Sequence, residues 1–152
     1  MNNNDVMRSI RYALDLPDAA IANMVGLTGY AVDVAAIAPL LKDEADPDAA
    51  VCDDALLAAF LDGLIIHQRG ARDTPPAPIK RLTNNLIFKK IRIAFDLKED
   101  DLHAILKLAE FEISKPELSA IFRNPDNKNY RQCGDQLLRY FLKGLNIKLR
   151  GE

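Results

Sequence analysis

The sequence CDDALLAAFLDGL, at residues 52–64, returns as CGDQLLRYFLKGL at residues 133–145. Both copies follow the pattern C-x-D-x-L-L-x-x-F-L-x-G-L, and the second copy lies 81 residues after the first. The leucine and phenylalanine positions form an apolar stripe at helical spacing. The pattern therefore predicts an amphipathic helix that is present once in each half of the chain.

The similarity extends well beyond this helix. When residue n is set beside residue n + 81, residues 3–70 align with residues 84–151 without a gap, and 19 of the 68 positions are identical. Two repeats are too few for a solenoid, whose stacking usually needs at least about three units. We therefore predict an all-α fold in which two tandem repeats pack with pseudo-twofold symmetry. They would form one compact unit over residues 1–152, joined by a proline-rich linker at residues 71–83.

Apolar periodicity predicts about four helices in each repeat. Asp33 and Ser114 are suited to cap the third helix of their repeats, and Pro116 suits a first helical turn. The expected helices cover residues 4–14, 18–27, 34–41 and 54 onward in the first repeat, and residues 85–95, 99–109, 115–123 and 135 onward in the second.

The end of the fourth helix has two interpretations. The favoured one treats Gly63 and Gly144 as C-terminal glycine caps. Residues 64–69 and 145–150 would then be short extended segments that pair with each other, since residues 145–150 alternate apolar and polar side chains. In the alternative, the two glycines lie inside a longer helix, where they permit close packing.

Composition limits the class of protein. The chain has 152 residues, of which 49% are hydrophobic and 28% charged, as is typical of a globular domain. No apolar run approaches the roughly 20 residues needed to span a bilayer. The N-terminus lacks the basic start and apolar core of a signal peptide. We therefore expect a cytoplasmic protein without membrane contact.

The sequence contains none of the familiar catalytic motifs. The chain has two histidines, His67 and His103, and neither belongs to a metal-ligand pair. No glycine-rich phosphate loop is present. Cys52 and Cys133 occupy equivalent positions and are expected to be buried, reduced thiols; a disulfide between the repeats is the alternative. We expect a protein that is not an enzyme and has no metal, cofactor or small-molecule ligand. A small-molecule site between the repeats is the remaining enzymatic possibility.

Four stretches of the chain are distinctive: RSIRYALDL at residues 8–16, CDDALLAAFLDGL at 52–64, RLTNNLIFKKIRIAF at 81–95 and NYRQCGDQLLR at 129–139. They resemble the YehS-like family of bacterial proteins, a duplicated domain of unknown function. The resemblance covers nearly the whole chain and implies a bacterial, cytoplasmic protein, but it implies no catalytic or binding residue.

Charge is divided unevenly between the two halves. Residues 1–78 contain 5 basic and 12 acidic residues, a net charge of −7, whereas residues 79–152 contain 15 basic and 10 acidic residues, a net charge of +5. Lysine and arginine on one surface would neutralise phosphates, and Tyr130 or Tyr140 could stack on bases. The candidate nucleic-acid-binding residues are Lys80, Arg81, Lys89, Lys90, Arg92, Arg139, Lys143, Lys148 and Arg150.

Two functions are compatible with this pattern. The preferred one is a non-catalytic module that binds RNA or DNA through the basic C-terminal repeat. The alternative is a protein-interaction module or a homo-oligomer, in which the acidic half of one molecule meets the basic half of another. A solvated basic surface that only balances the acidic half would bind neither partner.

Overall fold

The computed structural model describes residues 1–70 and 81–151, and every regular element in this part of the chain is helical. The prediction of an all-α fold is therefore confirmed. Contacts between Cα atoms divide the chain into two compact units, Met1–Leu82 and Thr83–Glu152. Face-to-face packing of the two repeats around a pseudo-twofold axis stays a prediction.

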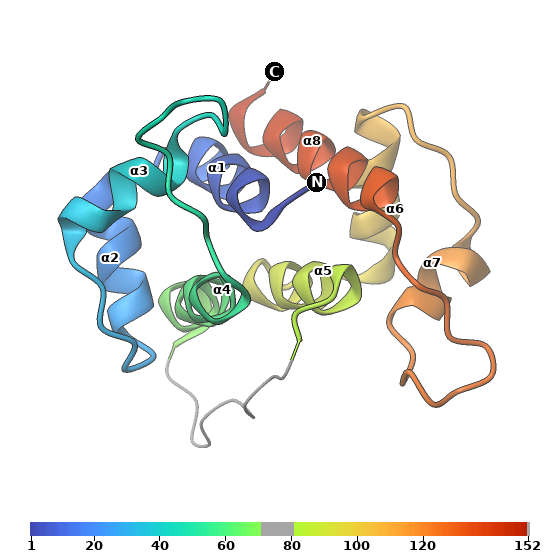
Figure 1. Ribbon diagram of the computed structural model, residues 1–152. Coiled ribbons are helices and arrows are strands. Elements are labelled where there is room, and N and C mark those ends of the chain that lie inside the picture. The colour runs from blue at the N-terminus through green and yellow to red at the C-terminus, as the bar shows by residue number, and fades with distance from the viewer. Residues whose placement is uncertain (71–80, 152) are drawn as a thin grey trace. The chain divides into compact units, whose positions relative to one another are not determined.

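The first unit contains four α-helices and a short 3₁₀ turn, coloured blue to green in Figure 1. The long helix α4 packs against α1 and, most extensively, against α2. A loop connects α3 to α4. The elements are α1 (Asn3–Leu14), α2 (Asp18–Gly26), the 3₁₀ turn (Val34–Ala36), α3 (Ile37–Leu41) and α4 (Asp54–Arg69).

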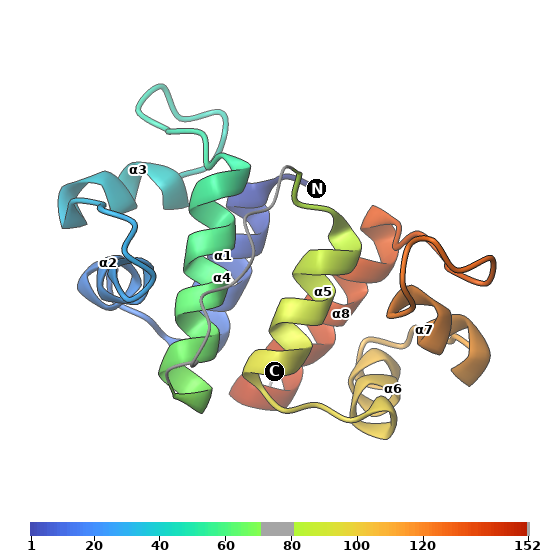
Figure 2. The same ribbon diagram turned by 90° about the horizontal axis from the view of Figure 1, so that it is seen from below.

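The second unit repeats this order of helices. Helix α8 packs against α6 and α5, and Figure 2 shows α5 and α8 running alongside each other. The elements are α5 (Asn84–Ala94), α6 (Glu99–Leu108), α7 (Lys115–Ile121) and α8 (Asp135–Arg150).

Asp15 and Asp96 occupy equivalent positions in the two repeats, just after the first helix of each unit. Asp15 and Asp96 both have a φ of 51°, the left-handed conformation. In each case the following amide closes the helix, because Leu16 N–H donates to Arg11 O and Leu97 N–H donates to Arg92 O, each over 3.0 Å. This is the six-residue closure common after a helix, and aspartate tolerates the conformation better than most residues.

The predicted extended segments are wrong. Residues 64–69 continue α4 and residues 145–150 continue α8. Gly63 and Gly144 lie inside these helices, where a Cβ atom would come within 1.9 Å of Met24 O and 2.0 Å of Ile105 O respectively. The glycines are required because α2 and α6 cross the long helices there at backbone contact distance. The helices end instead at Gly70 and Gly151, both with positive φ.

Each unit closes an apolar core around its long helix. In the second unit the Phe88 and Phe141 rings are stacked with centroids 4.2 Å apart, and the Phe122 ring meets Phe88 edge-on at 5.0 Å. Met7 and Phe60 occupy the equivalent core positions in the first unit and are fully buried. The apolar stripe of the repeated motif is therefore the core face of α4 and α8.

Candidate functional site

Two adjacent asparagines hold the start of each repeat together, and we call each pair an asparagine clasp. In the first repeat, Asn3 Nδ2 donates to Cys52 O over 3.1 Å and to Asp54 Oδ1 over 2.8 Å. Asn4 Nδ2 donates to Leu40 O and Ala50 O, and Asn4 Oδ1 accepts from Cys52 N. The first turn of α1 is thereby tied to the end of α3 and to the chain just before α4.

The second repeat contains the same clasp, shifted by 81 residues. Asn84 Nδ2 donates to Cys133 O over 3.1 Å and to Asp135 Oδ1 over 2.7 Å. Asn85, which is only 7% exposed, donates to Ile121 O and Arg131 O and accepts from Cys133 N. The invariance of these residues between the copies thus has a structural explanation.

The clasp also explains the titration of its neighbours. The Asn3 amide, together with the Leu82 N–H, lowers the pKa of Asp54. The Asn84 amide lowers the pKa of Asp135.

Burial, reinforced by nearby aspartates, raises the pKa of Cys52 and of Cys133 to about 12. Both cysteines are buried and unpaired. Because the thiolate is the reactive form, neither has the character of a nucleophile at neutral pH.

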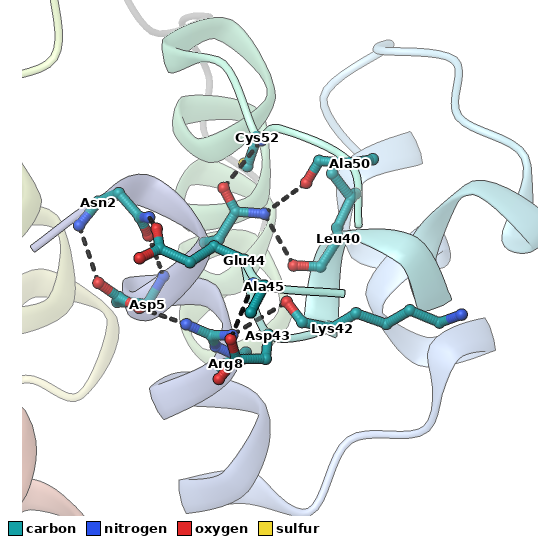
Figure 3. Close-up of polar contacts among 11 residues, drawn as sticks. Asn2, Asp5, Arg8, Leu40, Lys42, Asp43, Glu44, Ala45, Ala50 and Cys52 are labelled. Atoms are coloured by element: carbon teal, nitrogen blue, oxygen red, sulfur yellow. Dashed lines mark hydrogen bonds and ion pairs between the residues drawn. The ribbon is translucent and has the colours of Figure 1, made fainter. Parts of the chain in front are cut away.

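A pocket of about 390 Å³ lies beside the clasp of the first repeat. Its two cations are neutralised by neighbouring acids. Arg8 forms an ion pair with Asp5 and donates to Lys42 O (Figure 3). Lys42 Nζ lies 3.8 Å from Asp48 Oδ2. Glu44 also lines this pocket and accepts a hydrogen bond from Asn2.

A pocket of about 420 Å³ occupies the equivalent place in the second repeat. It has cations at the same two positions, since Lys89 corresponds to Arg8 and Arg123 corresponds to Lys42. None of the residues that line it is acidic. We call it the second-repeat pocket, and its lining is Thr83, Asn85, Leu86, Lys89, Ile121, Phe122, Arg123, Asn124, Pro125 and Tyr130.

The loops beside the two pockets share a backbone but differ in charge. In the first repeat, Asp43 Oδ1 accepts from Ala45 N and Asp46 Oδ1 accepts from Asp48 N, over 2.9 and 2.8 Å. In the second, Asn124 and Asn127 accept the equivalent bonds over 2.9 and 2.8 Å. Residues 42–50 contain one basic and four acidic residues, a net charge of −3, whereas residues 123–131 contain three basic and one acidic residue, a net charge of +2.

The candidate residues of α5 have different environments. Lys89 is exposed at the pocket. Lys90 is half-buried. Arg92 is engaged inside the unit, because its Nε donates to Leu97 O over 2.9 Å and its guanidinium lies 4.6 Å from the centre of the Phe122 ring. Arg92 is therefore better explained as a structural residue than as a phosphate ligand.

The candidates on α8 lie on two faces. At about 100° per residue, Arg139, Lys143 and Arg150 fall within about 40° of one another, and Lys148 falls on the opposite side of the helix. All four are exposed. Tyr140 packs against Phe111 with ring centroids 5.1 Å apart, so it belongs to the fold.

The remaining two candidates precede α5. Lys80 lies outside the described residues. Arg81 is exposed in the first unit, where its charge contributes to the lowered pKa of Asp54. Neither residue can therefore be placed relative to the candidates on α5 and α8.

Sequence reasoning missed Arg123, which the structure places at the second-repeat pocket with Lys89. A signal for it was available. The alignment sets Arg123 against Lys42, Pro125 against Glu44 and Asn129 against Asp48, so a cation is kept while the acids around it are lost.

Comparison with known proteins identifies the family. A model described as "Protein of unknown function (DUF1456)" matches residues 3–70 and, a second time, residues 84–151. The chain belongs to the DUF1456 family. The two DUF1456 matches have the boundaries predicted for the repeats, so the tandem duplication is confirmed.

A relative supports the same assignment. This DUF1456 chain is 44% identical over 147 residues to the uncharacterized protein YehS of Escherichia coli strain K12. The alignment covers 95% of this chain and 94% of that protein. The resemblance to the YehS-like family is thereby confirmed. No solved structure shows a significant match to the chain.

Within residues 1–70 and 81–151, no group of three or more His, Cys, Asp or Glu side chains is arranged to hold a metal ion. None of the helices there has the length and apolar character that crossing a membrane would require.

Proposed function

We propose that this DUF1456 protein is a non-catalytic module that binds RNA or DNA through its basic second repeat. The observation that carries the proposal is the charge difference between equivalent loops, −3 over residues 42–50 and +2 over residues 123–131. The turns are formed equally well by aspartate and by asparagine at these positions. Folding of the loop therefore does not require the change from a negative to a positive net charge. Contact with a polyanion requires a positively charged loop.

Several exposed cations support the proposal. Lys89 and Arg123 line the pocket, and Arg139 and Lys143 lie one turn apart on α8. Exposed lysine and arginine bind phosphates by displacing condensed counterions, which makes the affinity strongly dependent on salt. About four such contacts to a single strand would weaken binding roughly 50-fold between 50 and 200 mM salt.

Fluorescence anisotropy with a labelled single-stranded oligonucleotide tests the proposal. We expect the double variant Arg139→Glu/Lys143→Glu to weaken binding at least about tenfold and to reduce the slope of log K against log salt by about 1.4. Lys107→Glu/Lys115→Glu changes the net charge equally on α6 and α7 and should have a much smaller effect. Equal effects of the two double variants would contradict recognition by α8.

The competing hypothesis is self-association through the oppositely charged loops. Analytical ultracentrifugation at low and high salt separates it from nucleic-acid binding. If the protein forms oligomers that dissociate as salt is raised, and if it does not bind oligonucleotides, the nucleic-acid proposal is contradicted and a protein-interaction module is supported.

A further inference from the structure

We propose that the second-repeat pocket holds one nucleotide of a single strand, with its phosphate on Lys89 and Arg123 and its base against the ring of Tyr130. The inference rests on the proposed function and deepens it by naming the subsite. Neither Arg123 nor the pocket is part of the α8 surface, so the two can be tested separately.

The phosphate side of the pocket is defined by two cations from different elements. Lys89 lies in the second turn of α5, and Arg123 follows the end of α7. Both are exposed, and neither forms an ion pair within residues 1–70 and 81–151. Their counterparts Arg8 and Lys42 are each paired with an aspartate. An arginine and a lysine that line one pocket without acidic partners are suited to a phosphate, which arginine can bind through two N–H groups.

Three acids around the first-repeat pocket have no acidic counterpart in the second repeat. Asp5, the partner of Arg8, corresponds to Leu86, and Asp48, the partner of Lys42, corresponds to Asn129. Glu44 corresponds to Pro125. The frame of hydrogen bonds around the pocket is unchanged, since Tyr130 N–H donates to Asn127 O over 2.9 Å as Ala49 N–H donates to Asp46 O over 3.0 Å.

The remaining wall suits a nucleobase. Leu86, Phe122, Pro125 and Tyr130 line the pocket together with the cations, and Tyr130 is half-buried. In the first repeat an alanine, Ala49, stands at the position of Tyr130. Stacking on an aromatic ring does not depend on the identity of the base, and it requires a base that is free of a duplex. Asn124 accepts from Asp126 N with its side-chain oxygen, which leaves its amide N–H₂ as a donor toward the ligand.

The test uses the full chain with three probes: a twelve-nucleotide thymidine oligonucleotide, thymidine monophosphate and inorganic phosphate. We expect Lys89→Met/Arg123→Met to weaken oligonucleotide binding at least about tenfold, and Tyr130→Ala to weaken it roughly tenfold. Arg8→Met/Lys42→Met removes the equivalent cations of the first repeat and should leave binding unchanged. Competition by inorganic phosphate without any effect of Tyr130→Ala would overturn the stacking part of the inference.

A second measurement needs no variant. In NMR titrations of the wild-type protein, thymidine monophosphate should shift the amide signals of Thr83, Lys89, Asn124 and Tyr130 and leave those of Arg8 and Lys42 in place. Shifts confined to α8 would overturn the pocket.

The outcomes separate the subsite from the proposed function. Oligonucleotide binding that is lost in Arg139→Glu/Lys143→Glu but unchanged in Lys89→Met/Arg123→Met overturns the subsite and supports the proposed function. Binding of thymidine monophosphate at the pocket without oligonucleotide binding supports a nucleotide site and overturns the proposed function. Failure of all three probes to bind overturns both.

Discussion

Asn85 is the clearest case of a polar side chain that the fold depends on. It is almost completely buried, and its amide group makes three hydrogen bonds to backbone atoms of Ile121, Arg131 and Cys133. Such a group would destabilise the core if it were unpaired, but here it satisfies backbone atoms that no helix can satisfy. A repeated asparagine pair could be mistaken for a ligand-binding motif, and the hydrogen bonds explain it as a structural one.

Replacement of Asn85 by alanine should lower the free energy of unfolding by about 3 kcal/mol, because it leaves two buried backbone groups and one part-buried backbone group without the partner they have in the native protein. Urea unfolding followed by circular dichroism measures the change. Asn129→Ala, at an exposed loop position, is the matched control and should change stability by less than about 0.5 kcal/mol. A loss no greater than that of the control would refute the role of the clasp.

Gly144 has an equally specific requirement. A Cβ atom there would lie 2.0 Å from Ile105 O and 2.9 Å from Ile105 Cγ2. Gly144→Ala should therefore destabilise the protein by about 3 kcal/mol or more, since α6 must move to make room. Gly26 has no atom within 4 Å of an added Cβ, so Gly26→Ala should be neutral or stabilise by up to about 1 kcal/mol. Thermal and urea unfolding of both variants test the difference.

The two long helices differ at the N-cap residue that precedes each of them. Asp53 caps α4, because its carboxylate accepts from Leu56 N over 2.8 Å, whereas Gly134 precedes α8 without a side-chain cap. The backbone of Gly134 has ordinary extended angles, with φ −76° and ψ 163°, and nothing lies within 4 Å of an added Cβ. Helix α8 therefore lacks a side-chain N-cap hydrogen bond, although the backbone conformation at Gly134 would allow an aspartate there to form one.

Gly134→Asp should supply this contact and raise stability by about 0.5 kcal/mol, through the new hydrogen bond and the favourable dipole interaction. Gly134→Ala is the control at the same site, and it should lower stability slightly because alanine is a poor N-cap. If urea unfolding finds the aspartate variant no more stable than the alanine variant, the capping argument fails.

The start of α4 also predicts a dependence on pH. Asp54 has a lowered pKa in the folded state because of the Asn3 amide and the Leu82 N–H. Its contribution to stability is therefore complete above the unfolded pKa of about 3.9 and is lost as pH falls through the lower folded pKa. Asp54→Asn should reduce the fall in melting temperature between about pH 5 and pH 3. Asp126→Asn, in the loop after α7, is the control and should leave the profile unchanged.

The molecule as a whole consists of one helical frame used twice with opposite charge. Because the clasp, the loop turns and the pocket positions are shared, the first repeat should accept the chemistry of the second. We expect a variant with Asp5→Leu, and with residues 42–50 replaced by the sequence RNPDNKNYR of residues 123–131, to gain a second nucleotide site.

Isothermal titration with thymidine monophosphate measures this gain as an increase in stoichiometry. A control variant with Asp43→Asn, Asp46→Asn and Asp48→Asn removes charge without adding the tyrosine, and it should not gain the site. An unchanged stoichiometry in the grafted protein, with an unchanged melting profile, would contradict the equivalence of the two pockets.

By itself, the sequence determined the duplication, its boundaries, the all-α class and the starts of most helices. These features depend on periodicity, on capping residues and on identity between the copies, all of which are local or visible by alignment. The charge difference between the repeats was equally evident, although its meaning at the pocket was not.

Tertiary structure alone decided where the long helices end and which cations line one pocket. Gly63 and Gly144 resemble helix caps in sequence, but close crossings by α2 and α6 place them inside helices. Arg123 and Lys89 are 34 positions apart in sequence, and the clasp of Asn85 brings their elements together. Contacts between distant segments override local preference in the first case, and they create the candidate site in the second.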